Sequence, residues 1–149
     1  MQRKLLFSLM TTMFAYAPFA LGDVIINEVD ADQTSTDTAE FIELYDGGVG
    51  NTSLDGMVVV LFNGSDDASY LAFDLDTYTT GVDGYFVLCN DAANVGNCDY
   101  DAGVADNMIQ NGADAVALYT GDAVDFPNDT PITTTNLLDA IVYGTSDSD

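Results

Sequence analysis

The stretch Glu40-Phe-Ile-Glu-Leu-Tyr45 sets a pattern that the rest of the chain repeats. In an extended strand, Phe41, Glu43 and Tyr45 would face one side and the two residues between them the other, because successive side chains alternate. Similar short apolar runs, rich in Val, Ile, Phe and Tyr, recur after residue 22 and are typical of strands. The expected strands are 24–26, 41–45, 57–62, 70–75, 85–88, 115–119 and 140–143.

Turn signals separate these runs. Each is an Asp or Asn followed by Gly, residues that tolerate the positive φ of tight turns. They are Asp46-Gly47, Asp55-Gly56, Asn63-Gly64, Asp83-Gly84 and Asn111-Gly112. No segment after residue 22 has the sustained 3.6-residue apolar period of a helix. The sequence therefore predicts an all-β protein, a β-sandwich of about seven short strands.

The N-terminus is typical of a secretory signal. Arg3 and Lys4 precede an apolar run from Leu5 to Tyr16, and small residues up to Gly22 offer a cleavage site. The alternative is a membrane anchor, but the run is shorter than the roughly 20 residues that span a bilayer. We expect residues 1–22 to be a signal peptide and residues 23–149 to be one exported domain, with no membrane attachment after cleavage. Its polar end at Asp149 is either a natural terminus or the start of a linker in a longer protein.

The charge of the predicted mature part is one-sided. All 25 acidic residues lie from Asp23 onward, the only two basic residues are in the predicted signal, and the chain has no His. Direct nucleic-acid binding is not expected, because it rests on Lys and Arg neutralising phosphates. Such a surface attracts cations, and dissolved salt or divalent metal would relieve its self-repulsion. We expect a secreted bacterial protein from a saline habitat; a solubility surface alone would also explain the charge.

The chain is nevertheless expected to fold. Hydrophobic residues make up 48% of it and aromatic residues 11%, unlike the composition of disordered chains. Its two cysteines, Cys89 and Cys98, flank a loop rich in Asn, Asp and Gly. An even pair in an exported chain favours a disulfide. Zinc is the competing interpretation, but it would require further soft ligands that the chain lacks.

Calcium is the sharpest candidate ligand. It takes six to eight oxygens from carboxylates, amides and carbonyls. Alternate spacing in an extended segment puts two carboxylates on one side, as in Asp30 with Asp32 and Asp99 with Asp101. These four residues are our candidate Ca²⁺ ligands, although no cofactor is required for the fold. Neither pair lies in an EF-hand pattern, and a solvated acidic surface is the alternative.

Catalytic chemistry finds little support in the residue types. A Ser or Cys nucleophile would have neither His nor Lys as its base. Paired carboxylates can hydrolyse glycosides, but Glu40 and Glu43 would point to opposite faces of a strand, and the chain has no Trp to form a sugar platform. We therefore do not expect this chain alone to be an enzyme.

Several motifs, in order, resemble the lamin-tail domain, of the bacterial secreted type found at the N-terminus of extracellular nucleases. They are Val24-Ile-Ile-Asn-Glu28, Glu40-Phe-Ile-Glu-Leu-Tyr45, Leu54-Asp-Gly-Met-Val58, Gly84-Tyr-Phe-Val-Leu88, Gln110-Asn-Gly-Ala-Asp-Ala-Val-Ala-Leu-Tyr119 and Leu138-Asp-Ala-Ile-Val-Tyr-Gly144. The resemblance covers nearly all of residues 24–144 and implies an immunoglobulin-like β-sandwich. The resemblance also implies that Glu28, Glu40 and Glu43 are part of the family's fold pattern. Their side chains would bond to the backbone or to a metal ion at the end of a sheet.

The resemblance implies an accessory role. Such modules stand beside catalytic domains, so we expect a non-catalytic unit for interaction, attachment or positioning in a larger extracellular protein. The first alternative is the N-terminal part of a secreted metal-dependent nuclease or phosphodiesterase, with its catalytic residues beyond position 149. The second is a stand-alone calcium-dependent adhesion or matrix module. The sequence identifies neither the protein or cell-surface partner nor the oligomeric state.

Overall fold

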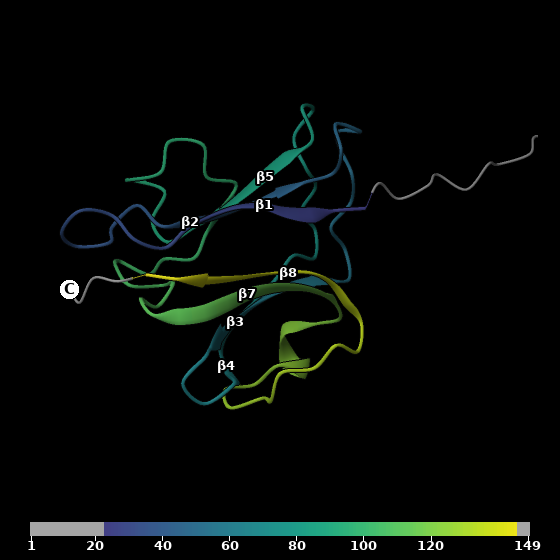
Figure 1. The fold of residues 1–149 in the computed structure, drawn as a ribbon. Coiled ribbons are helices and arrows are strands. Elements are labelled where there is room, and N and C mark those ends of the chain that lie inside the picture. The colour runs from purple at the N-terminus through teal and green to yellow at the C-terminus, as the bar shows by residue number, and fades with distance from the viewer. Residues whose placement is uncertain (1–22, 146–149) are drawn as a thin grey trace, which may run out of the picture.

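Two β-sheets pack face to face in the computed structural model, which describes residues 23–145 (Figure 1). One sheet has the strand order β1-β2-β5-β6 and the other the order β4-β3-β7-β8. The strands are β1 (Ile25–Asp30), β2 (Phe41–Tyr45), β3 (Met57–Asn63), β4 (Ala68–Asp74), β5 (Tyr85–Cys89), β6 (Tyr100–Asp101), β7 (Ala113–Thr120) and β8 (Leu137–Gly144). The predicted signal, residues 1–22, and the last four residues lie outside the described part.

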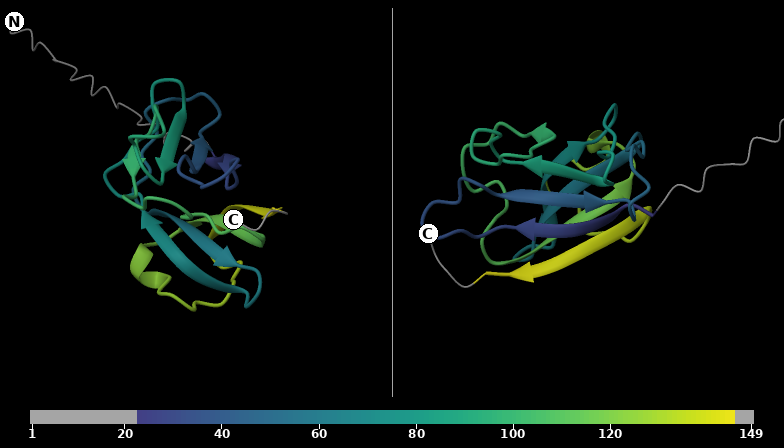
Figure 2. Two further views of the ribbon diagram at one scale, coloured as in Figure 1. Left: turned by 90° about the vertical axis from the view of Figure 1, so that its left-hand side faces the viewer. Right: turned by 90° about the horizontal axis from the view of Figure 1, so that it is seen from above.

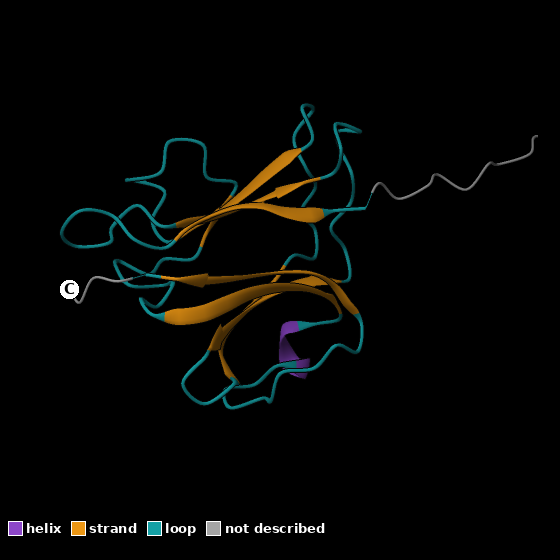
Figure 3. Cartoon of the chain, in the orientation of Figure 1, coloured by secondary structure: helices purple, strands orange, loops and turns teal. Residues whose placement is uncertain are grey.

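The predicted β-sandwich is confirmed, and all seven expected strands overlap an observed one. The expected number of strands was one too low, because β6 is an eighth strand. It has two residues and no apolar alternation, and it exists only through its parallel pairing with β5. Within residues 23–145 the helical part is a single 3₁₀ turn, η1 (Ala123–Asp125), shown in purple in Figure 3. This part contains no helix long and apolar enough to cross a membrane.

The core lies between the sheets. Ile42 and Leu44 of β2 point inward and are fully buried, as the alternation in the sequence requires. Their facing partners come from β3 and β7, and the fully buried members of this core include Ile42, Leu44, Leu54, Val59, Leu61, Phe86, Leu88, Val116 and Leu118. Burying one such side chain contributes about 1.5–3 kcal/mol, so the core is the main stabilising term.

Each open side of the sandwich is closed by a contact between the sheets. On one side β1 and β8 run next to each other (Figure 2), and the backbone N–H of Ile26 donates to Oδ2 of Asp139 at 2.9 Å. On the other side Tyr100 of β6 stacks on Tyr78, with ring centroids 5.1 Å apart, and meets the ring of Phe73 edge-on. The unpredicted strand β6 thus places an aromatic ring over an otherwise open edge.

The outer faces of the two sheets differ in their cover. The segment 121–136 folds over the outer face of β3 and β7, where Phe126 packs on Tyr119 (Figure 1). On the other sheet the loop between Cys89 and Cys98 covers β5, with Val95 buried against Val87. Phe41 of β2 packs under the same loop, but among the described residues no apolar cluster covers the rest of the outer face of β1 and β2.

Candidate functional site

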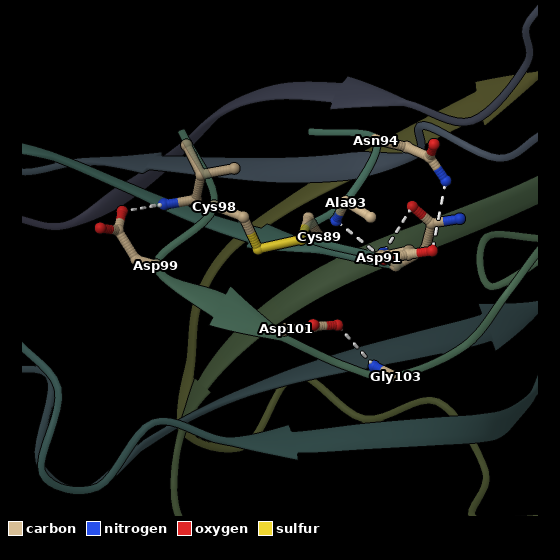
Figure 4. Close-up of a disulfide and its surroundings, with 10 residues drawn as sticks. Cys89, Asp91, Ala93, Asn94, Cys98, Asp99, Asp101 and Gly103 are labelled. Atoms are coloured by element: carbon tan, nitrogen blue, oxygen red, sulfur yellow. Dashed lines mark hydrogen bonds between the residues drawn. A yellow bond between two sulfur atoms is a disulfide. The ribbon is translucent and has the colours of Figure 1, made fainter. Parts of the chain in front are cut away.

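The predicted disulfide is confirmed. Cys89, at the end of β5, bonds to Cys98 with an S–S distance of 1.98 Å (Figure 4). The enclosed loop is shaped by Asp91, whose carboxylate accepts from the backbone N–H of Ala93 at 2.8 Å and from the side-chain amide of Asn94 at 3.2 Å. The disulfide and these bonds hold the loop over the sheet.

The candidate calcium ligands lie in two separate places. Asp30 pairs with Phe41, Phe41 pairs with Cys89, and Cys89 pairs with Asp101, so one row of residues crosses the whole sheet. Asp30 and Asp101 stand at its two ends, three strand spacings or roughly 14 Å apart. The Asp30/Asp32 pair and the Asp99/Asp101 pair therefore cannot share one ion.

Three of the four candidate side chains bond to their surroundings. Asp30 accepts from Nε2 of Gln33 at 2.9 Å, and Asp101 accepts from the backbone N–H of Gly103 at 2.9 Å (Figure 4). Asp99 accepts from the backbone N–H of Val87 at 2.9 Å, so its side chain takes the place of a strand partner beside β5 at this position. Nowhere between residues 23 and 145 do three or more carboxylate or thiol side chains converge in a group that could hold a metal ion. Calcium binding by either pair stays a prediction, and it would require backbone carbonyls and water as further ligands.

The buried carboxylates form a different and more ordered arrangement. Four acidic residues are almost inaccessible to solvent: Asp37, Glu40, Asp46 and Asp114. All four accept hydrogen bonds from groups in loops. Because the described chain contains no cation, these polar donors are what offsets the loss of hydration.

Asp46 is the most heavily bonded of the four. It directly follows β2, and its Oδ1 accepts from the N–H groups of Gly48 at 3.0 Å and Val49 at 2.9 Å. Its Oδ2 accepts from the N–H of Gly50 and from the hydroxyls of Thr52 and Thr80. One carboxylate therefore fixes the loop after β2 and joins it to the loop before β5.

The surroundings of Asp46 favour its ionised form. Burial by itself raises the pKa of a carboxyl group. Here the hydroxyls of Thr52 and Thr80, with the N–H groups of Gly50 and Val49, outweigh burial and hold the pKa of Asp46 below its ordinary value of 3.8. A side chain at Gly84 would collide with this carboxylate, which explains the glycine at that position.

Glu40 shows the opposite balance. Its two oxygens accept from the N–H groups of Met108, at 2.6 Å, and Ile109, at 2.9 Å, and so fix the segment before β7. Burial is the largest influence, and the nearby carboxylates of Asp37 and Asp106 add to it. Two backbone donors do not compensate, and the pKa of Glu40 rises from 4.5 to about 7.

The remaining two carboxylates also act on loops. Asp37 accepts from the backbone N–H of Gln33 at 2.8 Å and from the amide of Asn111 at 2.8 Å. Asp114 of β7 accepts from the N–H of Gly64 at 2.8 Å and so fixes the turn after β3. Asn63-Gly64 was predicted as a positive-φ turn, but Gly64 has no positive φ; a side chain there would collide with the carbonyl of Ala113.

Sequence reasoning missed Asp37 and Asp46 as buried groups. For Asp46 a signal exists, since three glycines and a threonine follow it within six residues, at Gly47, Gly48, Gly50 and Thr52. The glycines let the backbone curl around the carboxylate. For Asp37 no local signal exists, because its partner Asn111 is 74 residues away.

Replacing Glu40 should change the pH dependence of stability. The folded state keeps a proton on Glu40 up to about pH 7, whereas an ordinary glutamate loses it near 4.5. The stability from this group is therefore complete below pH 4.5 and is lost as the pH rises through 7. We predict that Glu40→Gln flattens the decline of the melting temperature between pH 5.5 and 8, measured by circular dichroism. Glu43→Gln, three residues further along in β2, is the control; equal slopes in both variants would contradict the assignment.

The calcium prediction has its own test. If an aspartate pair binds Ca²⁺, millimolar calcium should raise the melting temperature more than sodium chloride of equal ionic strength. Asp30→Asn with Asp32→Asn, or Asp99→Asn with Asp101→Asn, should remove that extra gain. Asp66→Asn with Asp67→Asn is the control for lost charge, because both residues are exposed in the β3–β4 turn. Equal effects of the two salts would identify the candidate pairs as ordinary acidic surface.

Comparison with known proteins agrees with this architecture. The model of the Lamin Tail Domain family matches residues 17–144, which include every strand of the sandwich. No curated protein and no solved structure matches the chain. The matched range also contains the four buried carboxylates and the disulfide. The chain belongs to the Lamin Tail Domain family.

Proposed function

We propose that this lamin-tail domain is a non-catalytic interaction or positioning module, accessory to a larger extracellular protein. The observation that carries the proposal is the use made of the buried carboxylates. Asp37, Glu40, Asp46 and Asp114 are the acidic groups that the fold shields from water, and each bonds to loop backbone or loop side chains. Catalytic acids need oxygens that are free to reach a substrate. Asp37 and Asp114 line surface pockets, but their carboxylates accept hydrogen bonds from Asn111 and Gly64 of the domain itself.

Export is part of the proposal. The Cys89–Cys98 disulfide supports an oxidising compartment outside the cytoplasm. The acidic residues without any cationic partner support a salt-rich medium, because dissolved ions screen their repulsion. A secreted nuclease is the parent protein that fits this role best, with the domain holding or orienting the enzyme rather than performing its chemistry.

The chain beginning at Asp23 should be catalytically inert. Its core and hydrogen bonds lie within residues 23–145, so it can be produced and assayed without the predicted signal. We predict no hydrolysis of duplex DNA or of bis(4-nitrophenyl) phosphate with Mg²⁺, Mn²⁺ or Ca²⁺ at millimolar concentration. Metal-dependent hydrolysis that copurifies with the folded domain and disappears in Asp30→Asn/Asp32→Asn or Asp99→Asn/Asp101→Asn would show that the module is an enzyme.

Reading the coding sequence past codon 149 tests the accessory role separately. An open frame that encodes a second domain with the His, Asn and Asp residues of a metal-dependent phosphodiesterase would support it. A stop codon directly after codon 149 would contradict it and leave a module that works alone.

A further inference from the structure

On the outer face of β1 and β2, and at Tyr85 at the start of β5, two rows of side chains lie outside the apolar cluster that the Cys89–Cys98 loop covers. The first is an apolar row in which Ile25 pairs with Tyr45, and Tyr45 pairs with Tyr85. The second lies two residues earlier in β2, where Glu28 and Glu43 stand directly opposite each other. We call these five residues the tyrosine–glutamate face.

The apolar row is exposed although its residue types favour burial. Ile25 is 42% exposed and Tyr85 is 37% exposed, and the rings of Tyr45 and Tyr85 stack with centroids 4.6 Å apart. The adjoining loops also expose apolar side chains, Val49 after β2 and Val82 before β5, which are 62% and 84% exposed. Contiguous exposed apolar groups rimmed by polar residues are typical of interaction sites.

The loops beside this row are held in place. Asp46 accepts its five hydrogen bonds directly after Tyr45, and the hydroxyl of Tyr45 lies against Gly48. The N–H of Asn51 donates to the carbonyl of Gly81 at 3.0 Å and so joins the loop after β2 to the loop before β5. The face is therefore organised before any partner arrives, which lowers the entropy lost on binding.

The glutamate row lacks a positive charge. Like charges directly opposite on neighbouring strands destabilise a sheet. Glu43 accepts from Nδ2 of Asn27 at 2.7 Å, which is a neutral donor. Residues 23–145 contain no Lys, Arg or His, so after removal of the predicted signal a cation for this pair would come from another molecule.

We propose that the tyrosine–glutamate face binds an extended, arginine-bearing segment of a partner protein. Alternate residues of an extended segment lie about 7 Å apart on one side, which is also the spacing between the two rows along β2. An apolar side chain at one position would lie on the tyrosines, and an arginine two residues away would reach Glu28 and Glu43. Arginine suits both rows, because its planar group pairs with carboxylates and stacks on aromatic rings.

The charge of the domain argues against other occupants. A second copy, without the predicted signal, would bring the same acidic face and no Lys, Arg or His, and nucleic acid would bring further negative charge. This inference rests on the proposed interaction role and names its surface and the chemistry of its partner.

A designed peptide can test the face directly. The probe has the repeat Leu-Ser-Arg-Ser, which places leucine and arginine two residues apart. The control peptide has the same composition with leucine and arginine adjacent. In 150 mM NaCl, amide chemical-shift changes in the chain starting at Asp23 should concentrate on β1, β2 and the start of β5 with the probe, and the control peptide should bind more weakly.

Matched variants distinguish binding at this face from non-specific attraction by the overall negative charge of the domain. Glu28→Gln with Glu43→Gln should weaken probe binding about tenfold, the order expected for two ion pairs. Asp66→Asn with Asp67→Asn removes the same charge at the far β3–β4 turn and should change binding less than twofold, because salt screens distant charges. Tyr85→Ser should weaken binding, whereas Val142→Ser, on the other sheet, should not.

Three results would overturn the inference: no binding of the probe, shift changes spread over the whole acidic surface, or equal weakening by the two charge-removing pairs. Shift changes on this face caused by raising the protein concentration alone would identify a second copy as the occupant and would also overturn it. None of these results bears on the absence of hydrolysis, so failure of this surface and failure of the proposed function can be told apart.

Discussion

The structure depends on carboxylates that are buried without a positive charge beside them. An ordinary protein would pair such groups with Lys or Arg, but the described chain has neither. Here backbone N–H groups, hydroxyls and one side-chain amide donate hydrogen bonds to the carboxylates instead. These donors come from the loops at the ends of the sandwich. Each of these hydrogen bonds stabilises a buried carboxylate and also fixes the position of the loop that donates it. The outcome depends on the donors: five of them keep the pKa of Asp46 below its ordinary value, and two leave that of Glu40 raised.

These opposite shifts have opposite consequences for stability. The contribution of Asp46 is present above its ordinary pKa and is lost as the pH falls through its lowered value in the folded state. That of Glu40 is lost as the pH rises through 7. Repulsion among the surface acids also weakens as they take up protons. These shifts therefore favour the folded state most at mildly acidic pH.

The sequence predicts the sheets better than it predicts the loops. Strands such as β2 and β5 are visible as apolar runs between turn signals, because inward and outward residues alternate locally. β6 escaped prediction because its two residues pair only after the disulfide loop has brought them to β5. The burial of Asp37 escaped prediction because its partner is Asn111, and the sequence could not say which backbone groups Glu40 bonds, because they lie at residues 108 and 109. The two aspartate pairs proposed for calcium were chosen on local spacing, and the sheet register separates them.

The measurement that tests this account most directly is a carboxyl titration of Asp46 by NMR, with hydrogen exchange of the amides of Gly48, Val49 and Gly50. We predict that the carboxyl titrates below the ordinary value of 3.8 and that the three amides stay protected until it takes up a proton. A titration at or above 3.8, with these amides exchanging freely at neutral pH, would contradict the account, because the carboxylate would then not be holding the loop.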